Sequence, residues 1–393
     1  MKKKLLFLYP YKFTEFEYYK FEINQFKKYK INIRISDLSL ILIKKNFYNE
    51  WKSRGAKDVK KHESILDFFN YLKKIKKKNL IIVNFLQNHH TVKTFIIRLI
   101  IKSFNIPQIH LNEVVASSYL KINKNVFYYL RKIKEHNLNF NVYLFYIKFF
   151  FSKFLFKFLN DKNDVIFSNQ KLESKNNSVL INNYDYSNSL TKTKKQKNFK
   201  NYAIYLDNGG PYFTGDTFFK GNKLPNYDVD KIYKDYISFF NNIQNDFNCK
   251  IIIIPHPKYK SSNKKIKSFN PYFKDFIVDN RPNALSLLAK KAKFFLSKGS
   301  LASSYGVINK KPIINFYSSD HIYEKEELSS IFTQAKLSGN LPFNIKYYTK
   351  QIIKKKLKVN KKKYNFYLNN HLTNRSTLKK TNCRIIVEYI KSN

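Results

Sequence analysis

The amino-acid sequence predicts an α/β protein made of two Rossmann-like domains that face each other across a cleft. Short apolar runs alternate with longer amphipathic segments, which is typical of a parallel sheet flanked by helices. This pattern stops at a polar, basic segment without apolar periodicity, residues 190–200, and then begins again. A length of 393 residues agrees with two to three domains of about 100–200 residues each.

The first domain is expected over residues 1–189 and the second over residues 201–350, with 190–200 as the linker between them. In the first domain the apolar runs predict strands at Leu5–Leu8, Ile31–Ile35, Leu80–Val83, Ile109–Leu111, Val165–Ser168 and Val179–Ile181. Helix-period segments lie between several of these strands, at Phe13–Lys28, Ser64–Lys77 and Val92–Phe104.

The second domain repeats the alternation. Strands are predicted at Tyr202–Leu206, Lys250–Ile254, Asp275–Asp279, Lys293–Ser297 and Pro312–Tyr317, and helices at Tyr233–Asp246, Ala284–Ala292 and Ser300–Asn309. Residues 351–393 form a Lys-rich extension that ends in a predicted helix, Thr377–Ile390. We expect this helix to pack back on the body of the protein.

The net charge points at first to nucleic acid. Lys and Arg number 74 against 27 Asp and Glu, which gives a formal charge of +47. However, the enriched residues share A/T-rich codons and Gly falls to 8, so part of the charge reflects a biased genome. No RNP1, GXXG or zinc pattern is present, and we predict no specific nucleic-acid partner. A basic RNA-binding protein is kept as the non-enzyme alternative.

Composition also predicts a folded protein in a reducing, cytoplasmic compartment. The hydrophobic fraction of 43% is too high for intrinsic disorder. Cys249 and Cys383 lie far apart and outside any CxxC spacing, so neither a disulfide framework nor a zinc site is indicated. The apolar run after Met1 is too short for a signal peptide, and no stretch of 18 residues lacks charge.

The most informative segment is IIIIPHPK, residues 251–258. Four β-branched residues predict a buried central strand that delivers His256 to its carboxyl edge, where ligands bind in open parallel sheets. The flanking prolines fix the backbone around this histidine. A histidine after a strand is also a common loop residue, so the neighbouring segments decide its significance.

A second segment, FFLSKGSLASSYG, predicts a strand, a glycine turn at Gly299 and a helix opened by hydroxyl residues. Unpaired backbone N–H groups at such a helix start favour a phosphate, and Ser300, Ser303 and Ser304 can add donors. The structural alternative is that Ser300 merely caps the helix. No Walker-type GxxxxGK[ST] sequence is present.

A third segment, LDNGGP, places Asp207 at the end of the first strand of the second domain. A carboxylate beside a phosphate site can take the proton of an attacking hydroxyl group. The same letters also form an ordinary turn sequence, and Asp216 is a second candidate with the same ambiguity. No Asp-x-Asp sequence follows a convincing strand, so no metal is predicted.

The order LDNGGP, IIIIPHPK and LAKKAKFFLSKGSLASSYGVINKKPIINF resembles the carboxyl-terminal half of GT-B glycosyltransferases of bacterial surface polysaccharide synthesis. It is similar in particular to bacterial sialyltransferases and capsule transferases, over roughly residues 201–318. The resemblance implies that His256 contacts the donor nucleotide and that Ser300, Ser303 and Ser304 hold its phosphate. It also implies that the acid of the motif, here Asp207, acts as the base.

The sequence departs from that pattern in the position of the acid. In the sialyltransferases the acidic motif lies in the first domain, whereas Asp207 opens the second, and Asn208 replaces the second acid of the motif. The base therefore has alternative candidates in the first domain, beside loops that follow predicted strands. These candidates are Glu15, Asp37, His89, His90 and Glu113.

Residues Val142–Leu159 predict a basic amphipathic helix. Its aromatic and aliphatic residues occupy one arc of about 140° at ~100° per residue, and Lys148, Lys153 and Lys157 lie off that arc. Such a helix suits contact with an anionic membrane surface, which would place the protein peripherally on the inner face of the cytoplasmic membrane. The alternative is an ordinary core helix.

Together these features predict a glycosyltransferase that moves a sugar from a nucleotide-activated donor, with CMP-sugars among the candidates, to a surface polysaccharide or lipid-linked glycan. The reaction is expected to invert the anomeric centre and to need no metal or cofactor beyond the nucleotide-sugar substrate. His256, Lys258 and the Gly299–Ser304 turn are expected to stabilise the departing phosphate. A nucleotide-sugar epimerase and a polyol-phosphate transferase are the enzymatic alternatives.

Overall fold

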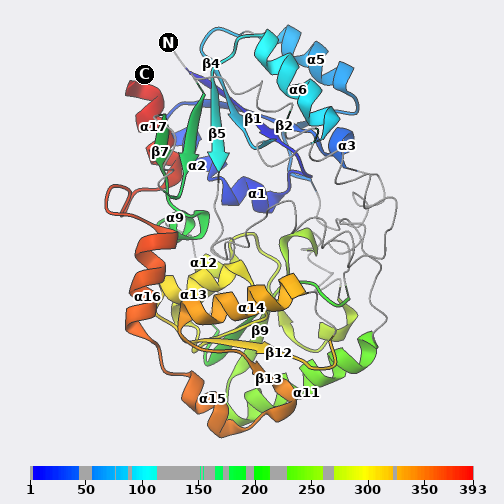
Figure 1. Ribbon diagram of the computed structural model, residues 1–393, viewed down its shortest axis with the longest axis vertical. Helices are drawn as coiled ribbons and strands as arrows, with labels where there is room; N and C mark the ends of the chain where they lie inside the picture. Colours follow the sequence, from blue (N-terminus) through cyan, green and yellow to red (C-terminus); the bar gives the residue numbers. More distant parts are fainter. Residues whose placement is uncertain are drawn as a thin grey trace.

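The computed structural model describes residues 3–43, 55–75, 77–86, 91–112, 151, 154, 164–170, 177–191, 199–212, 228–259, 270–321 and 325–392. The chain forms two α/β domains stacked along the long axis of the molecule (Figure 1). Each domain contains one sheet whose strands pair in parallel.

The first sheet has the strand order β3-β2-β1-β4-β5-β6-β7, the doubly wound order with β1 and β4 at its centre. Apolar residues on both faces explain its burial: in β1, Leu5 and Phe7 enter one core, and Leu6 and Leu8 enter the other. The strands are β1 (Lys4–Tyr9), β2 (Asn32–Asp37), β3 (Val59–Lys61), β4 (Leu80–Asn84), β5 (Gln108–Asn112), β6 (Val165–Ser168) and β7 (Ser178–Leu180).

The helix predicted over 13–28 is two helices, α1 (Glu15–Lys20) and α2 (Ile23–Lys28). The break falls at Glu22, whose φ of 54° is left-handed and ends regular helix geometry. Thr14 and Glu17 form a capping box at the start of α1. The further helices described before residue 190 are α3 (Ser39–Leu42), α5 (Ile65–Lys74), α6 (Val92–Ser103) and α9 (Tyr184–Ser189).

The second sheet has the order β10-β9-β8-β11-β12-β13, which repeats the doubly wound order with β8 and β11 at its centre. Its strands are β8 (Tyr202–Leu206), β9 (Lys250–Ile254), β10 (Ile277–Val278), β11 (Phe295–Ser297), β12 (Ile313–Tyr317) and β13 (Phe343–Asn344). The prediction of two Rossmann-like α/β domains is confirmed.

Helices cover both faces of the second sheet. One core lies against α12 and α13, and the other against α11 and α15. Gly306 allows α13 to approach closely, because a Cβ atom there would lie 2.6 Å from Cγ1 of Ile313 in β12. The helices are α11 (Val229–Phe247), α12 (Ala284–Leu288), α13 (Ser304–Ile308), α14 (Lys325–Ser338), α15 (Lys350–Lys356) and α16 (Lys361–Tyr367).

After α16 the chain crosses back to the first domain. A π-helical turn, η8 (Leu368–Leu372), leads to the last helix, α17 (Asn382–Ser392), which lies beside α2 and β7 (Figure 1). Cys383, Ile386 and Ile390 enter the core of the first domain. The sequence predicts one extension over 351–393; in the structure α15 and α16 pack in the second domain and α17 packs in the first.

Buried polar side chains secure this crossover. The Asn182 side-chain oxygen accepts hydrogen bonds from the hydroxyls of Thr373 and Thr377, both at 2.7 Å. The buried Glu22 carboxylate accepts from the backbone N–H of Cys383, at 2.8 Å, and from the Ser187 hydroxyl. These bonds join α17 and the segment that precedes it to the junction between the two domains.

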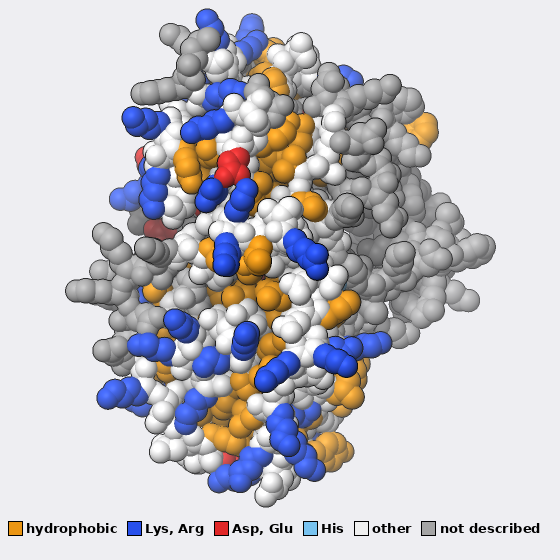
Figure 2. Space-filling model, turned by 90° about the vertical axis from the view of Figure 1, so that its left-hand side faces the viewer, with side chains coloured by type: hydrophobic (Ala, Val, Ile, Leu, Met, Phe, Trp, Pro, Cys, Tyr) orange, Lys and Arg blue, Asp and Glu red, His pale blue; other side chains and the backbone are white. Residues whose placement is uncertain are grey.

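Lys and Arg side chains are scattered over the face shown in Figure 2, with hydrophobic side chains between them. This distribution does not mark one basic groove on that face. Of the predicted amphipathic helix Val142–Leu159, only Phe151 and Phe154 are described, and both are more than half exposed. The rest lies outside the described residues. Within the described ranges, no helix combines the length and apolar character needed to cross a bilayer.

Candidate functional site

The candidate site lies at the carboxyl edge of the second sheet, where β8 separates β9 from β11. Leu206 of β8 pairs with Ile254 of β9 and with Ser297 of β11. The next residues on the outer strands are Pro255, followed by His256, and Lys298. Asp207, His256 and Lys298 therefore begin the loops at one edge, beside the point where the strand order reverses, which is where doubly wound sheets bind ligands.

Asp207 is buried, with 5% of its surface exposed. Its carboxylate accepts a hydrogen bond of 3.0 Å from the backbone N–H of Gly209, and this bond holds the turn that the LDNGGP letters predict. Burial raises the pKa of this carboxyl group, and the nearby positive charge of Lys298 offsets part of the rise. The aspartate thus serves the turn, and Lys298 favours its ionised form.

Lys298 is the residue at this edge that the sequence analysis did not single out. Its side chain is buried, and its ammonium group donates a 2.6 Å hydrogen bond to the backbone carbonyl of Gly210. The same group lies 4.6 Å from the centre of the Tyr236 ring, within cation–π range. One lysine among 74 basic residues carries no signal in the sequence; its burial at the strand end identifies it.

His321 joins the same cluster from the loop after β12 and was also missed. Its Nδ1 atom lies 3.4 Å from the Tyr236 hydroxyl. Burial, together with the charge of Lys298, lowers the pKa of His321 to about 3. The ring is therefore neutral at physiological pH, and Lys298 is the positive charge of this cluster.

His256 follows β9 as predicted and is partly buried. Its Nδ1 atom accepts a 3.3 Å hydrogen bond from the backbone N–H of Lys258, inside the short turn Pro257–Tyr259. In the neutral ring the proton therefore sits on Nε2, which makes that nitrogen a donor. A ring fixed in this way suits hydrogen bonding to a phosphate or sugar oxygen.

The glycine turn of the serine segment is present, but the helix that follows it is short. Gly299 has a φ of 77° and lies against Ile331 of α14, so its lack of a side chain is required by the backbone. A 3₁₀ turn over Leu301–Ser303 comes first, and α13 spans only Ser304–Ile308. The continuous helix predicted from Ser300 to Asn309 is therefore divided between two helix types.

The three serines of this segment differ in their surroundings. Ser300 is partly exposed, and its backbone N–H donates to the Ser297 hydroxyl at 3.0 Å. Ser303 and Ser304 are buried, and the Ser304 hydroxyl donates a 2.5 Å hydrogen bond to the Asp185 carboxylate in α9. Because that bond joins α13 to α9, Ser304 has a structural partner, and Ser300 is the serine with access to a ligand at the edge.

The alternative base candidates are only partly described. Asp37 ends β2, where its carboxylate accepts from the backbone N–H groups of Phe13, at 3.0 Å, and Ser39, at 2.9 Å, which organises the loop. Glu15 is exposed at the start of α1. Four further candidates lie outside the described residues: His89, His90, Glu113 and Asp216. In the described part of the chain, no three His, Cys, Asp or Glu side chains gather as metal ligands do.

Comparisons with known proteins give structural likeness only. No protein-family model matches the sequence, and no curated protein matches it either. The chain is similar to a solved structure of UDP-GlcNAc 2-epimerase from Neisseria meningitidis bound to UDP-GlcNAc, at 11% identity and a TM-score of 0.46, over 99% of this chain and 100% of that one.

Two further solved structures are similar at the same level. They are MurG from Acinetobacter baumannii, with 7% identity, a TM-score of 0.43 and full coverage of both chains, and the glycotransferase of kitacinnamycin, with 9% identity, a TM-score of 0.49 and 99% of each chain. Because these TM-scores are below 0.5, the fold is assigned from the strand orders above. Two doubly wound domains joined by a returning terminal helix define an α/β protein of the GT-B type.

Proposed function

We propose that the protein is a glycosyltransferase that moves a sugar from a nucleotide-activated donor to a glycan acceptor. The observation that carries the proposal is the buried Lys298 at the point where the strand order of the second sheet reverses. A buried ammonium group held in place by a backbone carbonyl is a fixed positive charge, and in low dielectric it acts strongly on a nearby phosphate. The donor phosphates would bind here, beside His256, Lys258 and Ser300.

The proposed reaction is a direct displacement with inversion at the anomeric carbon. A carboxylate takes the proton of the acceptor hydroxyl, whose oxygen forms the new bond to the anomeric carbon. The bond from that carbon to the phosphate oxygen breaks, and the nucleotide leaves with the electron pair. Lys298 and the His256 Nε2–H group would stabilise the negative charge that develops on the leaving oxygen.

The finer assignments belong to this proposal as well. The acceptor would be a surface polysaccharide or a lipid-linked glycan, and the enzyme would work in the cytoplasm against the inner face of the membrane. Support for the site comes from the edge cluster, and support for the membrane contact comes from the sequence of Val142–Leu159. Independence from metal ions stays a prediction.

The donor site is tested by thermal protection of the full chain. CMP-, UDP-, GDP- and CDP-activated sugars are added singly, and the unfolding midpoint is measured. We expect one class to raise the midpoint, and His256→Ala and Ser300→Ala to reduce that rise. Ser103→Ala, at the exposed end of α6, is the matched control and should leave it unchanged. Absence of protection by every class, or equal protection in all variants, would contradict the donor site.

The same proteins separate transfer from epimerisation. A donor that protects the chain is incubated with and without glycan acceptors, and the nucleotide and sugar products are identified. Transfer predicts release of nucleotide that depends on acceptor. Conversion of the nucleotide sugar into its epimer without acceptor would favour the epimerase alternative and contradict the proposal.

Asp207 as the base is tested with Asp207→Asn, because the amide oxygen still accepts the Gly209 N–H while the charge and basicity are lost. As the base, Asp207 is required for turnover and contributes little to donor affinity, so turnover should fall to background with binding preserved. If Asp207 only balances the charge of Lys298, the variant keeps turnover and binds the anionic donor more tightly. Retained turnover would move the search for the base to the first domain.

A further inference from the structure

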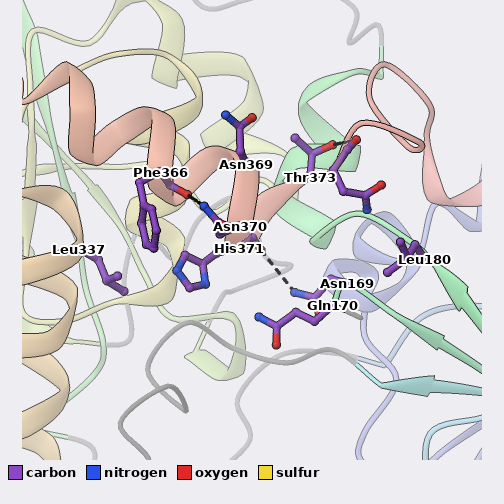
Figure 3. Close-up of a pocket in the computed structure, with 10 residues that line it drawn as sticks. Asn169, Gln170, Leu180, Leu337, Phe366, Asn369, Asn370, His371 and Thr373 are labelled. Carbon is purple, nitrogen blue, oxygen red and sulfur yellow. Dashed lines mark hydrogen bonds between the residues drawn. The ribbon is translucent and has the colours of Figure 1, made fainter. Parts of the chain in front are cut away.

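A pocket of about 540 Å³ lies between the two domains at the side where the chain crosses back. Asn169 and Gln170, which follow β6, and Leu180 of β7 line it from the first domain (Figure 3). Leu337 of α14, Phe366 of α16 and the segment around η8 line it from the second. Its volume falls within the usual range for small-molecule sites. The edge residues Asp207, His256, Lys298 and Ser300 are not among its ten described lining residues.

The described lining carries no charged side chain. In this protein 26% of all residues are charged, so ten uncharged neighbours at a solvent-connected pocket are unusual. The lining has five side-chain amides, one threonine hydroxyl and the ring of His371, whose pKa is lowered by burial, so that the ring is neutral at physiological pH. Such a lining offers both hydrogen-bond donors and acceptors without a net charge.

Two buried amide nitrogens at this pocket have no hydrogen-bond partner among the described residues, Nε2 of Gln170 and Nδ2 of Asn374. The orientation of the Asn374 amide follows from its contacts, because Oδ1 accepts from the backbone N–H groups of Ser376, at 3.1 Å, and Thr377, at 3.2 Å. A buried donor left unsatisfied is unfavourable, so a ligand acceptor or water is expected there.

Phe366 adds an apolar surface to this polar lining. The residue is 54% exposed although it lies beside the buried His371, with 5.8 Å between the ring centres. Figure 3 shows Phe366 and His371 on one side of the pocket, with Gln170 reaching in from the end of β6. A flat aromatic face next to amide groups matches a pyranose ring, which has apolar C–H faces and a rim of hydroxyl groups that both donate and accept.

We infer that this pocket binds a neutral carbohydrate unit and that the bound sugar joins the two domains. The ring would lie against Phe366, and its hydroxyls would accept from the lining amides, for which Gln170 and Asn374 turn their buried nitrogens into the pocket. The domains already meet here through a 3.4 Å hydrogen bond from Asn169 Nδ2 to the backbone carbonyl of His371. A sugar in the pocket therefore adds bonds across the same junction. This inference does not rest on the proposed transfer reaction.

The test measures binding of free sugars to the full chain without nucleotide. The probes are methyl glycosides of glucose, galactose, mannose, N-acetylglucosamine and N-acetylgalactosamine, with glucuronic acid and glucose 6-phosphate as charged counterparts. Saturation-transfer NMR detects binding, and titration gives the dissociation constants. We expect at least one neutral glycoside to bind and the charged counterparts to bind more weakly.

Two variants tie the binding to this pocket. Phe366→Ala removes the aromatic face and Gln170→Leu removes one amide, and each should weaken binding about tenfold, as loss of one good contact does. Tyr347→Ala is the control, because Tyr347 is an exposed aromatic residue outside the pocket. Failure of every neutral glycoside to bind, preference for the charged sugars, or wild-type affinity in both variants would overturn the inference. Failure of the nucleotide panel alone would leave it intact.

Discussion

Replacing Gly299 by alanine tests whether this glycine is required by the backbone or by a ligand. Gly299 links β11 to the turn that precedes α13, with a φ of 77°. An added Cβ atom would lie 3.0 Å from both the Cα and the Cγ1 atoms of Ile331 and 3.1 Å from its backbone nitrogen. These atoms belong largely to the backbone of α14, so the new methyl group is accommodated only if that helix shifts.

The expected loss of stability has two parts. Placing alanine in the left-handed region costs about 1–2 kcal/mol, and overpacking against a helix backbone costs about 1–3 kcal/mol. We therefore expect Gly299→Ala to lower the free energy of unfolding by about 2–5 kcal/mol. Urea titrations of the full chain, followed by circular dichroism, measure this difference.

Gly210→Ala is the matched control, because a Cβ atom there meets nothing within 4 Å. Its effect on the free energy of unfolding should stay within about 0.5 kcal/mol, because the added methyl group has no neighbour to displace. Equal stability of the two variants would refute the argument that the Gly299 turn is set by α14. The glycine would then be free to serve a bound phosphate alone.

Two further outcomes follow from buried polar contacts. Ser304→Ala and Asp185→Asn should each lower the free energy of unfolding by about 1–3 kcal/mol. The double variant should lose less than the sum, because both changes remove the same hydrogen bond between α13 and α9. Urea titrations measure these losses, and additive losses would show that the bond contributes nothing. The pKa of His321 is about 3 in the folded protein against an ordinary value of 6.5. Between these pH values only the unfolded chain binds the proton, so the free energy of unfolding decreases as the pH falls below 6.5. From pH 6.5 to 5 this loss is about 2 kcal/mol, and His321→Asn should lack it; identical pH dependence of the two proteins would contradict the burial of His321.

Strands buried on both faces were the best predicted part of the fold. The predicted bounds of β8 and β9 agree with the structure because their apolar runs are continuous and end abruptly. The short strand β3, with the sequence VKK, has no such run and was missed. It adds to the edge of the sheet by backbone pairing with β2, and backbone pairing leaves no pattern in the side chains.

Helices α15 and α16 of the basic carboxyl-terminal region were missed for a related reason, whereas its last helix was predicted. In α15 Ile353 is the one buried residue, and the lysines around it hide the helical period. The opposite error occurred at residues 13–28, where a good apolar period continued across two helices. The left-handed backbone at Glu22 separates the two helices. The buried Glu22 carboxylate binds the backbone of Cys383 in the distant helix α17, and this contact favours the helix break at Glu22.

At the candidate site, the local sequence predicts which residues reach the sheet edge, whereas contacts with distant segments determine what each side chain does. Strand ends in the sequence correctly brought Asp207, His256 and Gly299 to one edge, because the carboxyl ends of parallel strands must meet there. The roles of individual side chains depended on elements far away in the chain. Asp185 of α9 binds Ser304, and α14 requires the glycine, so neither contact follows from the letters of the motif.

Charge in this protein matters by position more than by amount. Most of the described Lys and Arg side chains are exposed, and a solvated charge exerts a weak, salt-screened influence on a ligand. Lys298 is buried at a strand end, where the lower dielectric strengthens its field and the Gly210 carbonyl fixes its direction. One residue therefore carries the electrostatic argument for a phosphate site, and the total number of lysines has no bearing on it.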